Sequence, residues 1–564
     1  MLKKLFNFAR ENPILILIVL LGAGLRLVAI GEMPPSLNWD EVSHGYNAYS
    51  ILKTGRDEWG ESFPTIFRAY GDYKLPVYIY LTAISEFFLG LSEFSVRLPS
   101  VLAGIATVAF TYLLVNEILK NKKIALLSAL LAAIEPWSLF LSRGAFEANL
   151  ALFFIVSGIY FFFKGINSSR FFVPATFLLG LSVWTYNSAR IFIPLLLVTL
   201  VFLFKDKLLE AYKNGKSFVR LSLILTALFL IPMFFQLLNP VGQARYGEVA
   251  IIDDGAIAQI IESREKSSFG PQITRLIYNR PTYFLSHFVK NWISHFSPGF
   301  LFLEGGSHYQ FSVPNNGLIY LVNLPFFVLG LIILLIKALK KDKTSALLLA
   351  WLMLSPIPSS LTREAPHVLR SITILPIPMV VTSLGLLTII NLFQKKFKYV
   401  ATMIYIIVAV VFLESYLNDY FVNYKKNYSW SWQYGYKQVF QFVKENYDDY
   451  DKIIITKKYG EPHEFILFYW PWNPKDFRSD LNIKRFYQSN WYWVDSFDKF
   501  YFVNDWSIPK EEWQDFVLES GDNFNCEQSN CLLITSPNNV PKGWNKIKAI
   551  NFLNGEVAFE MYEN

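Results

Sequence analysis

Residues 13–30, PILILIVLLGAGLRLVAI, contain a single charged residue and come shortly after the basic opening segment MLKKLFNFAR. The two segments resemble a signal peptide, but the apolar run lacks a small-residue cleavage motif and leads into many similar runs. We therefore expect an uncleaved first transmembrane span. A transmembrane helix needs about 20 mainly apolar residues, and eleven segments of the chain approach this requirement. They are 13–30, 96–118, 124–141, 148–163, 171–187, 190–204, 218–238, 317–336, 344–360, 371–393 and 399–415.

The amino-acid composition agrees with a membrane protein. Hydrophobic residues make up 53% of the 564 residues and charged residues only 17%, whereas charged residues are about a quarter of an ordinary soluble domain. The net charge is +7, but the Lys and Arg residues occur in short clusters between the apolar runs. This arrangement is typical of the cytoplasmic loops of polytopic proteins, so we expect no nucleic-acid partner.

The orientation in the membrane is predicted from the same clusters. With a cytoplasmic N-terminus, the predicted cytoplasmic segments carry 20 Lys and Arg residues and the short outer loops carry four. Three long segments, 31–95, 239–316 and 416–564, then lie outside the cytoplasm. We therefore predict a multi-pass protein of the cell membrane, with a transmembrane domain at 1–415 and an extracytoplasmic domain at 416–564.

The external segments predict different kinds of structure. The apolar stretch 76–91 is short and aromatic and contains Glu86, so we expect a helix that lies at the membrane interface. An oxidising compartment favours a local disulfide between Cys526 and Cys531, with two unpaired thiols as the alternative. The C-terminal segment predicts a small α/β domain, from a helical pattern at 433–447 and strand-like runs at 452–456 (KIIIT), 497–503 (FDKFYFV) and 531–535 (CLLIT).

Charged side chains gather at a few places on the predicted outer side. Charges close to membrane spans are costly and are therefore candidates for a functional site. The acids are Asp40, Glu41, Asp72 and Glu147, and the cationic or titratable partners are Lys74, Arg97, Arg143, His367 and Arg370. Acids and bases on one membrane face suit a site that binds an anionic lipid head group and activates a hydroxyl beside it.

Such a site can transfer a sugar from a lipid phosphate. Arg or Lys stabilises the departing phosphate through charge-assisted hydrogen bonds, most effectively in a water-poor site. A positioned carboxylate accepts the proton of the attacking hydroxyl. One carboxylate and in-line attack invert the anomeric centre, because no covalent glycosyl-enzyme forms. A nucleotide sugar is a poor donor here, since no Gly-rich phosphate loop is present.

The same stretches resemble a family of C-type glycosyltransferases that use lipid-phosphate sugars, the protein O-mannosyltransferase and aminoarabinose transferase group. The matching features are Asp40-Glu41 after the first span, Lys74-Leu75-Pro76, and Gly90 followed by Arg97-Leu98-Pro99-Ser100. Glu147 matches an acidic residue that the family has in its second external loop. The resemblance is close over about 30–150 and looser to about 415. Leu75 departs from it, because it replaces a proline, and Glu147 stands about one turn from the family's acid.

With the eleven predicted transmembrane helices, the resemblance implies a polytopic α-helical C-type glycosyltransferase fold. The predicted extracytoplasmic α/β domain agrees with the family only in its side of the membrane and its approximate size. The resemblance also implies that Asp40 is the base or orients the acceptor, that Glu41 supports it, and that Glu147 is a second acid near the acceptor. Lys74 and Arg97 would then meet the donor phosphate. We add Asp72, Arg143, His367 and Arg370 as further candidates for the phosphate site.

Simpler structural roles exist for the same side chains. Asp40 and Glu147 can stabilise helix N-termini, Lys74 can extend from an interfacial helix toward the head groups, and Arg97 can anchor the start of a span. The histidines, all on the predicted outer side, allow a metal site, but no pair has i,i+4 spacing. We therefore expect no required cofactor and leave a divalent metal open.

The predicted function is inverting transfer of a single hexosyl or pentosyl group from a polyprenyl-phosphate donor. The acceptor hydroxyl, on protein, glycan or lipid, lies at the outer face of the membrane. Two alternatives share parts of this pattern: a polytopic transporter or flippase, and a ligase that moves whole oligosaccharides from a diphosphate lipid. A transporter should carry charges within broken spans, whereas the charges here gather at one membrane face.

Overall fold

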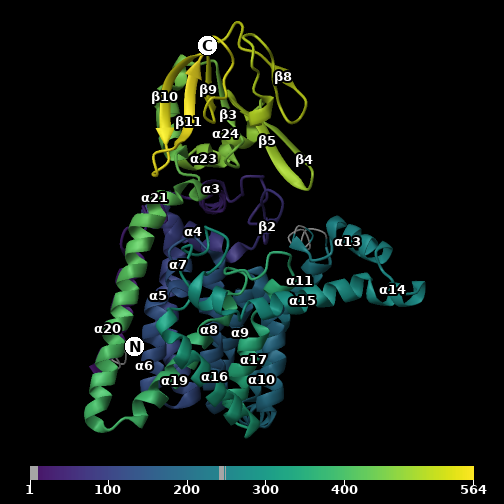
Figure 1. The fold of residues 1–564 in the computed structure, drawn as a ribbon. Helices are drawn as coiled ribbons and strands as arrows, with labels where there is room; N and C mark the ends of the chain where they lie inside the picture. Colours follow the sequence, from purple (N-terminus) through teal and green to yellow (C-terminus); the bar gives the residue numbers. More distant parts are fainter. Residues whose placement is uncertain (1–9, 240–246, 248) are drawn as a thin grey trace. The chain divides into compact units, whose positions relative to one another are not determined.

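The computed structural model describes residues 10–239, 247 and 249–564 (Figure 1). Lys3 and Lys4, which contribute to the predicted orientation, and part of the external segment 239–316 lie outside the described residues. The chain forms two compact units. The first contains Met1–Val28, Ser100–Ser142 and Phe146–Leu417, and the second contains Ala29–Pro99, Arg143–Ala145 and Asn418–Asn564.

The first unit is a bundle of apolar helices. Apolar runs form helices in a membrane because a helix satisfies its backbone hydrogen bonds within one segment. Seven helices of the described chain are long and apolar enough to cross a membrane. These seven are Glu93–Leu119, Glu147–Asn167, Asn187–Asn214, Lys216–Leu238, Leu321–Leu339, Ile372–Leu392 and Lys395–Asn427. The predicted multi-pass helical fold is confirmed.

The four remaining predicted spans are helical but shorter or interrupted. Prolines explain two interruptions, because a proline ends a helix before it and starts the next one. Pro136 separates two helices in this way. Pro356 lies between another pair, and Pro358 is the second residue of the second helix of that pair. The elements are α2 (Pro13–Leu27), α6 (Lys122–Ile134) with α7 (Pro136–Leu141), α9 (Phe172–Val183), and α17 (Lys343–Leu354) with α18 (Ile357–Ser360).

The other helices of the first unit include those at the remaining predicted spans. Between them, α13, α14 and α15 belong to the external segment that the sequence places between two spans (Figure 1). The further helices are α5 (Glu93–Leu119), α8 (Glu147–Asn167), α10 (Asn187–Asn214), α11 (Lys216–Leu238), α13 (Asp254–Glu265), α14 (Pro271–Ile277), α15 (Arg280–Ser294), α16 (Leu324–Leu339), α19 (Ile377–Leu392) and α20 (Lys395–Asn418).

Buried polar side chains hold the first unit together. The guanidinium of Arg26 donates to the carbonyl oxygens of Ala133 (2.9 Å) and Ala132 (3.0 Å) near the end of α6. The Glu135 carboxylate, between α6 and α7, accepts hydrogen bonds from the Tyr320 backbone N–H (2.8 Å) and the Asn323 amide (2.5 Å). Protein groups thus satisfy both buried charges, which gives them structural roles inside the bundle.

The second unit is built around a seven-stranded mixed sheet. Its strand order is β10-β11-β9-β3-β6-β5-β4, with β3 parallel to both neighbours and the other pairs antiparallel. The strands are β3 (Lys452–Thr456), β4 (Lys484–Gln488), β5 (Trp491–Phe497), β6 (Phe500–Val503), β9 (Cys531–Thr535), β10 (Asn545–Asn551) and β11 (Val557–Glu563). A disulfide joins Cys526 to Cys531 beside β9, as predicted.

The sheet differs from the sequence prediction at one strand. FDKFYFV (497–503) is not one strand. It contains the last residue of β5 (Phe497), a turn, and the whole of β6, which begins at Phe500. Asp498 in the turn has φ +49°, which a regular strand does not allow. The predicted helix 433–447 is α22 (Tyr436–Glu445), and it is followed by α23 (Pro462–Tyr469) and α24 (Pro474–Ser479).

The second unit also contains the first external loop, which the predicted division at 415/416 places in the transmembrane domain. This loop forms α3 (Trp39–Thr54), the short strands β1 (Phe67–Arg68) and β2 (Tyr73–Lys74), and α4 (Pro76–Leu89). Helix α3 packs against α4 and α23. The approach to α23 is close, because a Cβ on Gly45 would lie 2.5 Å from the Phe468 ring. The predicted helix at 76–91 is confirmed as α4.

A buried pair of carboxyl groups joins the first external loop to the sheet domain. The Glu58 and Glu464 side chains, the latter on α23, are both buried and interact electrostatically, and Arg485 of β4 donates to the Glu58 carbonyl oxygen (3.1 Å). Burial raises the pKa of Glu58 to about 7. Burial, together with the neighbouring Glu58 carboxylate, raises the pKa of Glu464 well above its usual range. Two neighbouring buried carboxyl groups avoid like-charge repulsion only while at least one of them keeps its proton.

This pair predicts a loss of stability as the pH rises. Below about pH 4.5 the unfolded chain also binds the proton, so the contribution of Glu58 is complete there. It decreases as the pH rises from this value and is lost once the pH passes about 7, the pKa in the folded protein. We expect the free energy of unfolding to fall by on the order of 2 kcal/mol over this pH range. The measurement is the melting temperature of the purified protein between pH 5 and pH 8.5. In Glu58→Gln the melting temperature should change less with pH. An equally steep change in the variant would show that other titrating groups cause the pH dependence.

Candidate active site in the first external loop

The N-terminus of α3 holds the Asp-Glu pair in a fixed geometry. The Asn38 side chain accepts a hydrogen bond from the Glu41 backbone N–H (3.0 Å), and the Glu41 carboxylate accepts one from the Asn38 N–H (3.2 Å). This reciprocal arrangement is a capping box. Asp40 lies between these residues in the first helical turn, where the helix dipole favours a negative charge.

Asp40 forms an ion pair with Lys74. The Lys74 Nζ lies 2.6 Å from Asp40 Oδ1 and 4.0 Å from Asp72 Oδ1. Lys74 stands on β2, which pairs with β1 as a short hairpin. The Asp40 side chain is 42% exposed, whereas that of Lys74 is 14% exposed. The sequence-predicted residues Asp40, Lys74 and Asp72 thus come together, and the carboxylate of Asp40 is the one that solvent reaches most.

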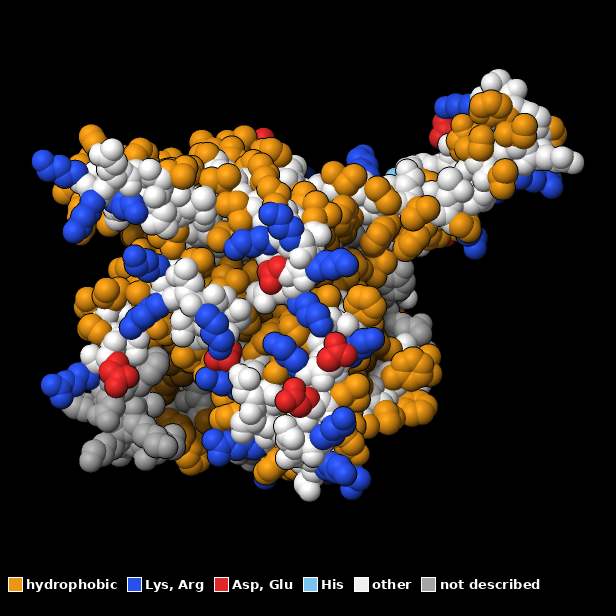
Figure 2. Space-filling model, turned by 90° about the horizontal axis from the view of Figure 1, so that it is seen from below, with side chains coloured by type: hydrophobic (Ala, Val, Ile, Leu, Met, Phe, Trp, Pro, Cys, Tyr) orange, Lys and Arg blue, Asp and Glu red, His pale blue; other side chains and the backbone are white. Residues whose placement is uncertain are grey.

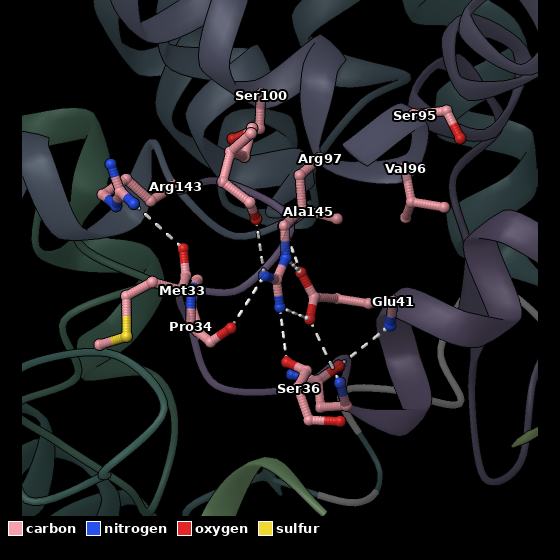
Figure 3. Close-up of polar contacts among 12 residues, drawn as sticks. Met33, Pro34, Ser36, Glu41, Ser95, Val96, Arg97, Ser100, Arg143 and Ala145 are labelled. Carbon is pink, nitrogen blue, oxygen red and sulfur yellow. Dashed lines mark hydrogen bonds and ion pairs between the residues drawn. The ribbon is translucent and has the colours of Figure 1, made fainter. Parts of the chain in front are cut away.

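Glu41 has a different environment, beside Arg97 (Figure 3). Its carboxylate accepts two parallel hydrogen bonds from the Arg97 guanidinium, from Nε at 2.9 Å and Nη2 at 3.0 Å. It also accepts a hydrogen bond from the Ala145 backbone N–H (2.8 Å). Together with the bond from Asn38, four donors surround this carboxylate, and the residue is 1% exposed. Glu41 therefore connects α3, the start of α5 and the turn at residues 143–145.

The remaining donors of Arg97 bind backbone oxygens. Nη1 donates to Ile30 O (2.9 Å) and Pro34 O (3.0 Å), and Nη2 donates to Ser36 O (2.5 Å). All five guanidinium N–H groups therefore have partners within the second unit, and the residue is 0% exposed. This environment argues against the predicted contact between Arg97 and a donor phosphate, because a phosphate would have to displace a buried carboxylate or carbonyl oxygens.

Arg143 is similarly buried within the second unit. Its Nη2 donates to Met33 O (3.2 Å) and its Nε to the Tyr420 hydroxyl (3.3 Å). The guanidinium carbon lies 5.0 Å from the centre of the Phe421 ring and 5.4 Å from that of Tyr420, within the range of cation–π contacts. Arg143 therefore also has a packed, aromatic environment, and its predicted role at the phosphate site stays a prediction.

The other sequence-predicted residues belong to the first unit. Glu147 is the first residue of α8 and is half-buried. Arg370 donates to the Thr362 hydroxyl (2.9 Å) and pairs with Glu364 (2.8 Å). The Nδ1 of His367 accepts a hydrogen bond from the Arg370 backbone N–H (3.2 Å). The predicted roles of Glu147, His367 and Arg370 in substrate binding remain predictions.

The described residues contain no group of three or more His, Cys, Asp or Glu side chains arranged to hold a metal ion. The Lys74 ammonium lies 2.6 Å from Asp40 Oδ1. In this structure the positive charge at the Asp40 carboxylate comes from this lysine.

Several residues that position Asp40 were not predicted. The Trp39 backbone N–H donates to the Gln433 side chain (2.8 Å), and the Tyr70 hydroxyl donates to Trp39 O (2.9 Å). Gly460 has φ +111°, and a Cβ there would lie 2.2 Å from the Trp39 ring. These contacts fix the residue next to Asp40. No local pattern predicts them, because Gln433 lies 394 positions from Trp39.

Comparisons with known proteins agree with this architecture. Residues 74–235 match the sequence model of the family described as dolichyl-phosphate-mannose-protein mannosyltransferase. Dolichyl-phosphooligosaccharide-protein glycotransferase 2 of Archaeoglobus fulgidus is 33% identical over 137 residues, which are 22% of this chain and 22% of that protein. The chain therefore spans about a fifth of this curated relative.

Two solved structures align with most of this chain. The archaeal oligosaccharyltransferase AglB from Archaeoglobus fulgidus, in complex with an inhibitory peptide and a dolichol-phosphate, aligns with a TM-score of 0.51 and 15% identity. The alignment covers 82% of this chain and 64% of that one. ArnT from Cupriavidus metallidurans bound to undecaprenyl phosphate aligns with a TM-score of 0.44 and 13% identity, over 83% of this chain and 76% of that one. The AglB alignment shows that the chain has the predicted C-type glycosyltransferase fold, and with the family match at residues 74–235 it confirms the predicted resemblance.

Proposed function

We propose that the chain is a membrane glycosyltransferase that takes its sugar from a lipid-linked donor. In the finer form of the proposal, it moves a single hexosyl or pentosyl group from polyprenyl phosphate to an acceptor hydroxyl on a protein, glycan or lipid. The observation that carries the proposal is the exposed Asp40 carboxylate, held at the N-terminus of α3 and 2.6 Å from the Lys74 ammonium. The matched family region begins at Lys74.

The proposed reaction is a single in-line displacement. Asp40 accepts the proton of the acceptor hydroxyl, whose oxygen forms a bond to the anomeric carbon. The bond between that carbon and the phosphate oxygen breaks, and the lipid phosphate leaves with the electron pair. Attack from the side opposite the leaving group inverts the anomeric centre.

We assign charge stabilisation of the leaving phosphate to Lys74. An ammonium group carries three donors, and the one on Lys74 stands beside the proposed base. Glu41 and Arg97 are positioning residues in this account, because their hydrogen bonds hold α3 and α5 together. A further proposal is the orientation, with a cytoplasmic N-terminus and the site on the outer face of the cell membrane.

Lys74→Met is expected to slow transfer about 10²- to 10³-fold, as the loss of one stabilising donor typically does. The measurement is the initial rate of radiolabelled sugar transfer at saturating acceptor. Lys53→Met is the matched control, because Lys53 is an exposed lysine of α3, and its rate should equal that of the unmodified protein. Equal rates for both variants would remove Lys74 from the reaction.

One observation favours a second candidate function. The curated relative that is 33% identical over 137 residues is a dolichyl-phosphooligosaccharide-protein glycotransferase, so transfer of a whole oligosaccharide is the alternative. The two functions are separated by giving the purified protein either polyprenyl-phosphate monosaccharides or diphosphate-linked oligosaccharides. We expect product from the monosaccharide donors alone; product from the oligosaccharide donors alone would establish the alternative, and no product from either would contradict both.

A further inference from the structure

Three helices of the external segment extend sideways from the bundle of the first unit (Figure 1). They are α13, α14 and α15, and none of the residues of α15 is buried. Many side chains of α15 therefore face solvent, lipid or another molecule. We call α14 and α15, with the residues that join them, the amphipathic arm (residues 271–294).

The two sides of α15 differ in chemistry. Apolar residues recur in pairs along one side, at Phe284 and Leu285, Phe288 and Val289, and Trp292 and Ile293. This spacing of i, i+1, i+4, i+5 forms one stripe on a helix. Leu285 is 61% exposed, Val289 43% and Ile293 57%. Phe284, Phe288 and Trp292 are half-buried, and Trp292 Nε1 donates to Met353 O (2.9 Å). The exposed edge of the stripe is therefore formed by Leu285, Val289 and Ile293.

Protein already occupies the other side of α15. Tyr283, His287 and Asn291 line a cavity of about 260 Å³ together with residues of α13. The Tyr283 hydroxyl donates to the Gln259 side chain of α13 (2.9 Å), and the Tyr283 and His287 rings stack with centroids 3.9 Å apart. The polar side thus faces α13 and the cavity, which leaves the apolar stripe as the side available to a partner.

The apolar surface continues along the arm. In α14, Ile273 is 52% exposed and Leu276 is 74% exposed. Figure 2 views the molecule from below and shows hydrophobic side chains over the underside of the projecting arm, with Lys and Arg at its margin. An apolar surface of this extent on a helix pair needs a partner that removes it from water.

The charge of the arm selects an anionic partner. Between residues 267 and 294 the chain has three cations, Arg275, Arg280 and Lys290, and no Asp or Glu. A lipid interface offers both acyl chains for the stripe and anionic phosphates for these cations. The chain enters this external segment from α11, a span whose apolar window is only 11% buried, so the preceding helix is already suited to contact lipid.

We propose that the amphipathic arm lies in the bilayer interface. Its stripe contacts the upper acyl chains, its cations contact lipid phosphates, and its polar side holds the cavity at the level of the head groups. This inference does not depend on the proposed sugar transfer, because it uses no residue of the Asp40 site.

The position of the arm is testable with nitroxide spin labels on the full chain in proteoliposomes. The native cysteines are joined in a disulfide, so Leu285→Cys introduces a single reactive thiol. Ser286→Cys is the matched control, because it is the adjacent exposed position, about 100° further around the helix. Both positions are exposed, so both variants should fold, and a melting temperature equal to that of the unmodified protein confirms this.

We expect the label at residue 285 to collide several times more often with oxygen, and several times less often with a water-soluble nickel complex, than the label at 286. Adding anionic phosphatidylglycerol to phosphatidylcholine vesicles should increase this difference, and Arg275→Gln with Arg280→Gln should remove the increase. Equal accessibility of both labels to the nickel complex would overturn the proposal and leave the stripe to a protein partner. An unchanged difference in anionic vesicles would overturn the role of the cations.

Discussion

Asp40→Asn is expected to lower sugar transfer by about 10²- to 10⁴-fold, the usual contribution of a general base. The amide has nearly the shape of the carboxylate but cannot accept the proton of the acceptor hydroxyl. The capping box of α3 uses Asn38 and Glu41 and does not involve the Asp40 side chain, so the helix should form normally. The measurement is the single-turnover rate with donor prebound, which separates the chemical step from binding.

Two further results make this prediction specific. Binding of the polyprenyl-phosphate sugar should change little, because the donor phosphate is assigned to Lys74. Asp449→Asn serves as the control, since Asp449 is an exposed acid of the same unit, and it should transfer at the normal rate. An Asp40→Asn protein with a rate within about threefold of the unmodified protein would remove Asp40 from the role of base.

Replacement of Arg97 is expected to destabilise the folded protein. Breaking a buried ion pair by removal of one partner costs about 3 to 5 kcal/mol, because the other charge stays buried and uncompensated. Arg97→Lys should be almost as harmful as Arg97→Met, since an ammonium cannot provide the five donors of the guanidinium. The measurement is the melting temperature of the purified protein in detergent, with the yield of monodisperse protein as a second indicator.

A double substitution tests whether the uncompensated charge of Glu41 causes the destabilisation. In Glu41→Gln with Arg97→Met, no charge remains buried, so the double variant should melt at a higher temperature than Arg97→Met alone. A phosphate-binding role makes the opposite prediction, namely that Arg97→Lys melts normally but binds the lipid-phosphate donor weakly. That result would support the contact between Arg97 and the donor phosphate that the sequence predicts.

The sequence was sufficient for the helices, and it singled out Asp40 and Lys74. Apolar runs of the required length predicted the spans, because membrane helices satisfy their own backbone hydrogen bonds. The sequence placed Asp40 and Lys74 at one membrane face, and the structure adds the ion pair between them. What could not be predicted is the division of tasks between adjacent acids: Asp40 is 42% exposed, whereas the Glu41 residue is 1% exposed.

This difference depends on contacts that no local pattern encodes. The partners of Arg97 are largely backbone oxygens at residues 30, 34 and 36, and any residue type supplies a backbone oxygen. The grouping of residues 29–99 with the C-terminal sheet depends on contacts such as Glu58 with Glu464, about 400 positions apart. The β5–β6 turn was missed because apolar residues continue through both strands, and only the backbone at Asp498 separates them.

The lipid released during transfer tests the central claim most directly. Purified protein is incubated with a polyprenyl-phosphate monosaccharide and an acceptor, and the lipid products are identified by mass spectrometry. The account predicts polyprenyl monophosphate in amounts equal to the glycosylated acceptor, and none from the Asp40→Asn protein. Release of polyprenyl diphosphate from a diphosphate-linked oligosaccharide, with no monophosphate from the monosaccharide donor, would contradict it.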